Sequence, residues 1–179
     1  MLMVRDEAAL LVVDMQARLV PAVLDGEAIL QRASILLAAA ARLAVPVAVS
    51  EQYPQGLGAT DGRLRLPADA VVLPKTAFSC LREPAIANHL ERLARRQIVV
   101  CGMETHVCVL QTALDLRRNG YEAFVAADAV GSRAAQRRQL GLDRMRAAGV
   151  AIVDSEMVVF EWLERAATDA FRELVRLLK

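Results

Sequence analysis

A regular alternation of short apolar runs with longer amphipathic segments constrains the fold of this chain most. The apolar runs are rich in Val, Leu and Ala, which is typical of buried parallel strands, and they cover residues 8–13, 45–49, 71–73, 98–101, 123–126 and 150–153. The segments between them repeat apolar residues every three or four positions, as helices do, over residues 27–43, 84–95, 106–119 and 133–148. Two closing helices are predicted near 157–163 and 168–178.

Strands that alternate with helices favour right-handed crossover connections, and therefore a parallel sheet with helices on both faces. A chain of 179 residues can bury one such core without disulfides or metals. We therefore predict a single α/β domain over residues 1–179, a three-layer αβα structure with a six-stranded parallel sheet of Rossmann-like type. Residues 51–70 form the one long turn-rich stretch, which is typical of a functional lid or a binding loop.

Charge and hydropathy limit the class of partner. The 22 basic and 21 acidic residues leave a net charge of +1, which gives no electrostatic basis for binding nucleic acid or an anionic membrane. The first residues lack a signal-peptide pattern, and no uncharged run approaches the roughly 18 residues that span a bilayer. We expect a cytoplasmic protein that acts on a small molecule. The mean hydropathy of +0.32 favours apolar surface covered by another subunit, and hence a homo-oligomer, although a thick α/β sandwich alone could absorb much of this apolar content.

Polar residues with complementary chemistry follow three of the apolar runs. Asp14 ends the first run, Lys75 ends the third, and the fourth leads into a turn that contains Cys108. Ligands bind beyond the carboxyl ends of the strands in an open parallel sheet, so we expect these side chains to meet at one edge. Taken singly, Asp14 would be a loop cap, Lys75 a surface lysine and Cys108 a small buried hydrophobe. Together they indicate a nucleophile with its activators.

The expected chemistry is that of a cysteine nucleophile. If Thr105 is the N-cap of the following helix, Cys108 lies in the first helical turn, near unpaired backbone N–H groups. We expect those groups and the Lys75 ammonium to lower the pKa of the Cys108 thiol. Asp14 can then accept the thiol proton and return it to a leaving group. His106 is two residues from Cys108 and points elsewhere on the helix, which disfavours a Cys/His pair; Cys80, Cys101 and His89 are assigned to packing or to the surface.

At these residues the sequence resembles the isochorismatase-like cysteine hydrolases, a family that includes nicotinamidases, carbamoylsarcosine-type amidases and many members without a known substrate. The resemblance covers nearly the whole chain. Four motifs carry it: LLVVDMQ at residues 10–16, LPKTAFS at 73–79, VVCGMETHVCVLQTALDL at 99–116 and AADAVGSR at 126–133. The order and spacing of the four motifs make the match specific.

The resemblance implies a six-stranded isochorismatase-type fold with an Asp/Lys/Cys triad, here Asp14, Lys75 and Cys108. It also implies a non-proline cis peptide between Met103 and Glu104, which directs the Glu104 N–H, with that of Cys108, into an oxyanion hole. The loop SEQYPQGLG and the turn GMETHVC are most similar to the branch named isochorismatase domain-containing proteins, whose substrate is unknown.

Departures from the family narrow the function. Nicotinamidases hold a metal with an Asp-x-His and a further His after the second strand, where this chain has Ser50-Glu51-Gln52-Tyr53-Pro54. With His89 and His106 as its two histidines, the chain is predicted to bind no metal. No other cofactor is expected, since neither GxGxxG nor a P-loop is present, and this disfavours a flavodoxin-like nucleotide binder. The resemblance implies that family members that cleave isochorismate have, in place of the nucleophile, a residue that does not attack. Because this chain has Cys108 there, isochorismate cleavage is disfavoured.

The leading hypothesis is a metal-free cysteine hydrolase that cleaves a C–N bond of a small amide or carbamoyl compound through a thioester. Four residues lie beside a triad position or on the long loop, and they are candidates for the substrate pocket: Gln16, Gln52, Tyr53 and Phe78. For each of them, packing of the loop is the alternative interpretation. The competing hypothesis is a binding or scaffold protein without turnover, or one in which Cys108 is a redox-sensing thiol.

Overall fold

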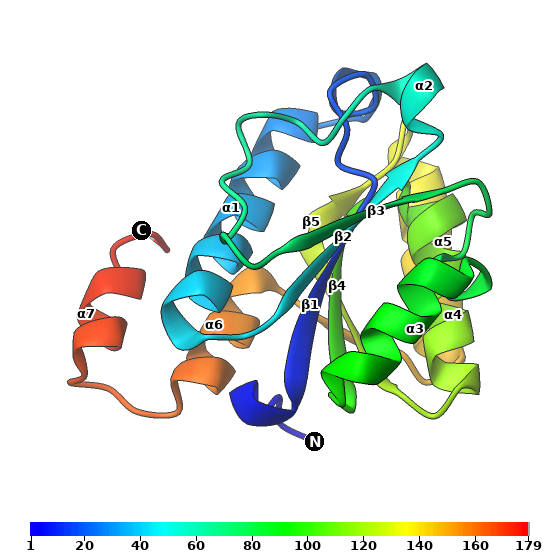
Figure 1. The fold of residues 1–179 in the computed structure, drawn as a ribbon. Coiled ribbons are helices and arrows are strands. Elements are labelled where there is room, and N and C mark those ends of the chain that lie inside the picture. The colour runs from blue at the N-terminus through cyan, green and yellow to red at the C-terminus, as the bar shows by residue number, and fades with distance from the viewer. Residues whose placement is uncertain (179) are drawn as a thin grey trace.

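The structure is a computed structural model, and it describes residues 1–178. Its six strands form one parallel sheet in the order β3-β2-β1-β4-β5-β6. Their bounds are β1 Ala8–Val13, β2 Val47–Gln52, β3 Val71–Lys75, β4 Gln97–Met103, β5 Glu122–Gly131 and β6 Ala151–Val153. The predicted fold class, a three-layer α/β structure around a six-stranded parallel sheet, is confirmed (Figure 1).

Helices cover both faces of the sheet. The helices are α1 Gly26–Leu43, α2 Pro54–Leu57, α3 Pro84–Leu93, α4 Leu110–Arg118, α5 Ala135–Ala147, α6 Ser155–Leu163 and α7 Asp169–Leu174. In Figure 1, α1, α6 and α7 lie on one side of the sheet and α3, α4 and α5 on the other. None of the helices described is at once long and apolar enough to cross a membrane.

The central strand shows why the sheet is covered on both faces. Every residue of β1 is buried. Successive side chains of a strand point to opposite faces, so Leu10 and Val12 join the core under α1 and α6, whereas Leu11 and Val13 join the core under α3, α4 and α5. An unbroken apolar run is therefore what this position requires.

The order of the strands in the sheet reverses between the neighbouring strands β1 and β4. The chain leaves β1 toward β2 on one side, and returns to β4 on the other. A crevice forms at such a switch point, beyond the carboxyl ends of the two strands. Gly102 allows the strands to meet closely there, because it has φ +126° and a Cβ at this position would lie 1.9 Å from the Val13 carbonyl oxygen.

Several predicted element boundaries differ from those of the structure, most of all around β2 and β5. The predicted strand 45–49 is β2, which starts at Val47 and continues through the polar residues Ser50, Glu51 and Gln52, because these pair with β3. The predicted loop 51–70 therefore begins after Gln52 and contains the short helix α2. Likewise β5 extends past residue 126, through an irregularity in its pairing with β4, to Gly131.

The predicted helix 106–119 begins with a different kind of turn. Thr105–Val109 form a π-helical turn, and α4 starts only at Leu110. The N-cap position falls on Glu104, and the Thr105 hydroxyl oxygen is buried without a hydrogen-bond partner in the described part of the chain. The prediction that Thr105 caps this helix is therefore wrong, although Cys108 does lie in the first turn after β4.

Candidate active site

Asp14 and Lys75 form a buried ion pair across the strand that separates them. Lys75 Nζ lies 2.7 Å from Asp14 Oδ2, and both side chains are 0% exposed. Asp14 has a positive φ of 53°, a conformation that Asp tolerates better than most residues, and its N–H donates to the Ser50 carbonyl at 3.0 Å. The Ser50 hydroxyl donates to Asp14 Oδ1 at 2.7 Å. The carboxylate is thus held from two directions by residues of β2 and β3.

The Lys75 ammonium is fully engaged. Besides its ion pair with Asp14, it donates to three acceptors: Gln52 Oε1 at 2.5 Å and the carbonyl oxygens of Ala77 and Phe78, each at 3.2 Å. An ammonium has three N–H donors, so these acceptors account for all of them. Lys75 therefore has a fixed position, and its charge faces Asp14 and the cavity beside it.

Cys108 reaches the same site from the π-helical turn. Its Sγ lies 3.8 Å from Gln52 Oε1, and the residue is 6% exposed. The Gln52 side chain is held by a hydrogen bond from its Nε2 to the Thr76 carbonyl at 2.8 Å. The amide oxygen of Gln52 therefore lies between the thiol and the ammonium, a contact that the apolar pattern of the sequence did not indicate.

The pKa of the Cys108 thiol is raised, whereas the sequence led us to expect that it is lowered. Burial, together with the negative charge of Asp14, raises it to about 12, and the opposing effect of Lys75 is smaller. Burial also raises the pKa of Asp14, although Lys75 and Ser50 act in the other direction. For Lys75, burial alone would lower the pKa, but the Asp14 carboxylate raises it above its ordinary value. The resting site is therefore a neutral thiol beside an ion pair, because Cys108 is more deeply buried than its place in a first turn indicated.

The turn that precedes Cys108 has the geometry that the family resemblance implied. The peptide bond between Met103 and Glu104 is cis. The Glu104 carboxylate turns toward the segment after β5, where Oε2 accepts from the Arg133 N–H at 2.9 Å and from Arg133 Nε at 3.0 Å, and Oε1 lies 2.5 Å from Arg133 Nη2. The role of the Glu104 and Cys108 N–H groups as an oxyanion hole remains a prediction.

A cavity of about 330 Å³ opens beside these groups, and we call it the triad cavity. Its lining residues are Asp14, Leu19, Gln52, Leu57, Phe78, Glu104, Val107, Cys108 and Arg133. The wall is apolar away from the triad end, apart from the Glu104–Arg133 pair. Asp14 and Cys108 line it directly, whereas Lys75 lies behind Asp14 and Gln52.

The four predicted pocket residues separate into two groups. Gln52 and Phe78 line the triad cavity. Gln16 is buried, and its amide binds the backbone of Gln52 and Gly58, so it joins β2 to the loop that follows. Tyr53 is 56% exposed at the start of α2 and is not among the lining residues.

Several lining residues were not predicted. Leu19, Leu57 and Val107 are ordinary apolar residues, and no local signal distinguishes them. Arg133 belongs to the AADAVGSR motif, which was a signal for this position, but its pairing with Glu104 depends on the fold.

The histidines lie outside the triad. His106 Nδ1 lies 3.0 Å from the Ser132 hydroxyl, and His89 is on α3. Within residues 1–178, no three His, Cys, Asp or Glu side chains are grouped so that they could hold one metal ion. The absence of a metal from the reaction remains a prediction.

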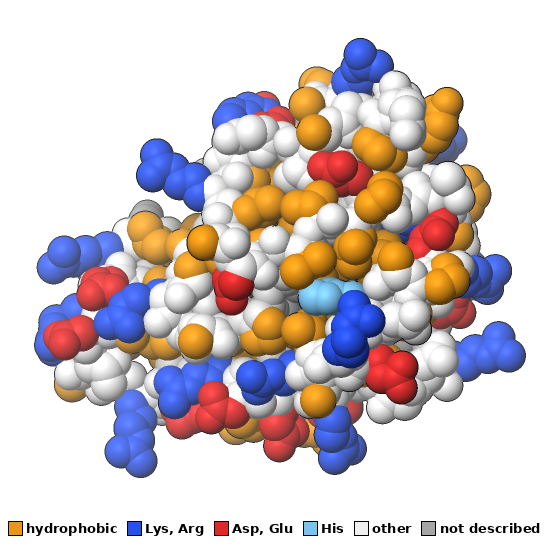
Figure 2. All heavy atoms as spheres, viewed as in Figure 1, with side chains coloured by type: hydrophobic (Ala, Val, Ile, Leu, Met, Phe, Trp, Pro, Cys, Tyr) orange, Lys and Arg blue, Asp and Glu red, His pale blue; other side chains and the backbone are white. Residues whose placement is uncertain are grey.

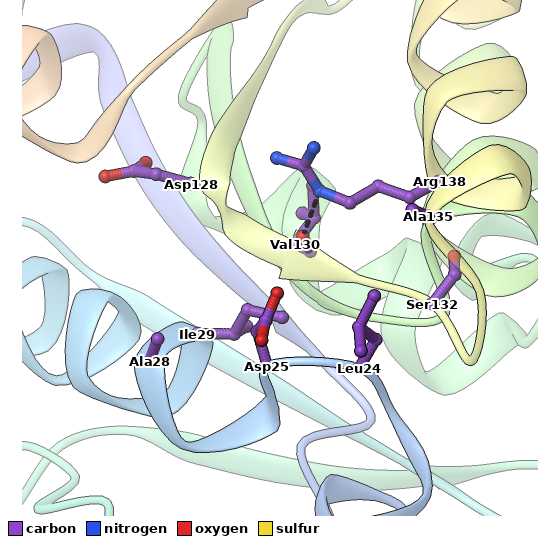
Figure 3. A pocket seen from close by; sticks show the side chains of 9 residues that line it. All are labelled: Leu24, Asp25, Ala28, Ile29, Asp128, Val130, Ser132, Ala135 and Arg138. Carbon is purple, nitrogen blue, oxygen red and sulfur yellow. Dashed lines mark hydrogen bonds between the residues drawn. The ribbon is translucent and has the colours of Figure 1, made fainter.

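A second cavity, of about 280 Å³, is lined in part by Ser132 and Ala135, on the segment that joins β5 to α5. Side chains from the start of α1, from β5 and from α5 surround it (Figure 3). We call it the Arg138 cavity, because Arg138 crosses it and donates to the carbonyl oxygens of Val130, at 3.0 Å, and Ala127. Its lining includes Asp128 and Ser132 but none of the triad residues, so the predicted chemistry belongs to the triad cavity alone.

Comparisons with known proteins agree with this fold and with the motifs. Residues 8–157 match the family model described as the isochorismatase domain. Isochorismatase domain-containing protein 1 from Salmo salar is 39% identical over 166 residues, a match that covers 93% of this chain and 59% of the relative. The chain thus spans less than two thirds of that relative's length.

Solved structures extend the agreement over the whole chain. The MAR1 ribonuclease from Caenorhabditis elegans superposes with a TM-score of 0.93 and 30% identity, over 99% of this chain and 92% of the other. The YcaC gene product of Escherichia coli, described as an octameric hydrolase of unknown specificity, has a TM-score of 0.93 at 23% identity, over 98% of this chain and 90% of the other, and shares the fold. The family model, the relatives and the fold together establish that this chain belongs to the isochorismatase family.

Proposed function

We propose that this protein is a cysteine hydrolase that cleaves the C–N bond of a small amide or carbamoyl compound, without a metal, through a thioester on Cys108. The observation that supports it most is the buried Asp14–Lys75 pair beside a cysteine in one cavity. Removing two charges from water is costly, so a buried pair whose carboxylate lines a cavity favours a chemical role.

In the proposed first half-reaction, the Asp14 carboxylate takes the thiol proton while Cys108 Sγ attacks the substrate carbonyl carbon. The pKa of Asp14 is raised by burial, which makes this carboxylate a stronger base than an exposed one. The Glu104 and Cys108 N–H groups would stabilise the oxyanion of the tetrahedral intermediate. The C–N bond then breaks, and Asp14 returns its proton to the leaving nitrogen.

In the second half-reaction, water attacks the thioester carbonyl, and Asp14 accepts a proton from that water. The second tetrahedral intermediate then releases the acid product and Cys108, which regains its proton from Asp14. Lys75 remains charged throughout and stabilises the carboxylate form of Asp14 between the proton transfers. Because the resting thiol is neutral, deprotonation accompanies attack and does not precede it.

The test is a screen of primary amides and carbamoyl compounds for release of ammonia. We expect activity in the wild type and none in Cys108→Ala, with an acyl adduct on Cys108 detected by mass spectrometry. Cys101→Ala is the matched control, because Cys101 is a buried cysteine of β4 that lies outside the triad cavity. Equal rates for wild type and Cys108→Ala would refute the proposal.

Two alternatives are tested by the same screen. A partner protein that binds wild type and Cys108→Ala equally, with no turnover of any amide, would support a scaffold. A redox-sensing role is disfavoured by the raised pKa of Cys108, since oxidants react with thiolates. The worm relative is named a ribonuclease, so RNA is included as a substrate, although an apolar cavity wall and a net charge of +1 favour a small neutral molecule.

We also propose a cytoplasmic homo-oligomer. Hydrophobic side chains gather over β3 in the middle of one face, while charged side chains lie mostly around its periphery (Figure 2). Val72 of β3 is 40% exposed. The octameric assembly described for the structural neighbour from Escherichia coli is consistent with association through such surfaces. Light scattering of the purified protein tests this, and a monomer at micromolar concentration would contradict it.

A further inference from the structure

The wall of the triad cavity indicates the kind of substrate that fits. Leu19, Leu57, Phe78 and Val107 line it, and they come from four separate segments of the chain. Apolar groups on all these segments favour an apolar substituent beyond the reacting carbonyl, because such a group is removed from water on binding. The volume of about 330 Å³ accommodates an amide with a short aliphatic or small aromatic group.

The Glu104–Arg133 pair provides the charged groups of this wall away from the triad. Glu104 is almost fully buried, with a side chain 8% exposed, whereas that of Arg133 is 58% exposed. The guanidinium and the Arg133 N–H together make three contacts with the carboxylate. Arg133 lowers the pKa of Glu104, which therefore remains ionised near neutral pH. The pair as a whole is electrically neutral.

We infer that the triad cavity selects uncharged amides with an apolar substituent, and that Glu104 determines this specificity by cancelling the charge of Arg133. This inference rests on the proposed amide hydrolysis. With its carboxylate partner in place, the guanidinium has little attraction left for a substrate carboxylate. Without that partner, the same guanidinium is a cation at the cavity wall and binds carboxylates well.

The experiment compares three amides of similar length that differ in the far end. Pentanamide ends in a methyl group, glutaric acid monoamide in a carboxylate and 5-aminopentanamide in an ammonium. The readout is kcat/KM for each charged amide divided by kcat/KM for pentanamide. A ratio is used because Glu104 also supplies a proposed oxyanion N–H, so absolute rates can change in a variant.

Glu104→Gln keeps the size of the side chain and removes its charge. We expect the carboxylate-to-methyl ratio to rise about tenfold at low salt and less at high salt, as an attraction between partly exposed charges does. Arg133→Gln leaves the Glu104 carboxylate without its partner, so the ammonium-to-methyl ratio should rise instead. The double variant Glu104→Gln/Arg133→Gln should return both ratios to near the wild-type values.

Asp143→Asn is the matched control. Asp143 forms an exposed ion pair with Arg146 on α5 at 2.9 Å, and neither residue lines the triad cavity. This variant removes one negative charge elsewhere on the surface, and should leave both ratios unchanged. Circular dichroism and the melting temperature establish that each variant is folded before its ratios are compared.

The outcomes separate this inference from the proposed function. If the wild type hydrolyses pentanamide through Cys108 but Glu104→Gln and Arg133→Gln do not shift the two ratios in opposite directions, the specificity inference is wrong and the proposed function stands. If the wild type prefers the carboxylate amide, the inference is wrong as well. If no amide is hydrolysed and Cys108→Ala behaves as the wild type does, the proposed function itself fails.

Discussion

The triad cavity and the Arg138 cavity both border the segment after β5, where Arg133 lines the first and Ser132 the second, and each is lined by acidic and basic side chains. In the Arg138 cavity these side chains bind backbone groups: Arg138 donates to the carbonyl oxygens of Ala127 and Val130, and Asp128 accepts from the Ser155 N–H at 2.8 Å. At the triad cavity, the lining residue Asp14 is paired with Lys75 behind it, and its carboxylate also faces the Cys108 thiol.

The two sites therefore differ in what their charged side chains bind. Arg138 and Asp128 satisfy backbone groups at an irregular strand and at the start of α6, which the fold would otherwise leave without partners. Lys75 also donates to two backbone carbonyl oxygens, those of Ala77 and Phe78, but it forms an ion pair with Asp14 in which both side chains are 0% exposed. The burial of two charges beside a thiol is costly, and this cost is what supports a chemical role.

The largest effect that tests this comparison comes from breaking the buried pair. Lys75→Met leaves the Asp14 carboxylate buried without a counter-ion, so we expect a loss of about 3–5 kcal/mol of folding free energy together with loss of activity. Urea denaturation measures the stability. The double variant Asp14→Asn/Lys75→Met removes the isolated charge and should recover part of the stability, but not the activity. If Lys75→Met is as stable as the wild type, the argument that burial of this ion pair is costly is wrong.

The next effect concerns the reactivity of Cys108. The pKa of its thiol is raised to about 12, so below that pH the thiol is protonated and the thiolate fraction rises about tenfold per pH unit. At pH 7.5, alkylation of Cys108 by iodoacetamide should be on the order of 10³-fold slower than in the unfolded chain, and should accelerate steadily up to pH 10.

Peptide mapping by mass spectrometry distinguishes the cysteines in that experiment. Cys101 is buried in β4 and its pKa is also raised to about 12, so its alkylation reports unfolding. A Cys108 rate that levels off near pH 8 while Cys101 stays protected would mean that the thiol is activated at rest, as its place in a first turn indicated.

The smallest effect is expected in the Arg138 cavity. Arg138→Met removes the donors to the Val130 and Ala127 carbonyl oxygens, and we expect a loss of about 1–2 kcal/mol of stability with activity retained. The measurement is again urea denaturation, now beside the amide assay. A loss of activity larger than the loss of folded protein would show that this cavity is coupled to the triad cavity, and the division between structural and chemical charges would then be wrong.

Much of the fold could be predicted, because a buried strand or helix face requires a pattern of apolar residues that is local in the sequence. Strand β1 was predicted at its observed bounds, Ala8–Val13, since a strand buried on both faces is an unbroken apolar run. The predicted end of β2 at residue 49 was too early. Ser50, Glu51 and Gln52 are polar and interrupt the apolar run, although they pair with β3. The π-helical turn at Thr105–Val109 was missed, because no apolar period distinguishes one turn of π-helix from one of α-helix.

The fold class, the family and the candidate residues that follow β1, β3 and β4 could be predicted from the sequence, because each depends on motifs or on apolar runs that are local in the chain. How these residues behave depends on the tertiary structure. The pKa of Cys108 depends on burial and on the charge of Asp14, and the pairing of Glu104 with Arg133 joins residues 29 positions apart. Electrostatic energies depend on distance and on exclusion of water, and both are set by packing between segments remote in sequence.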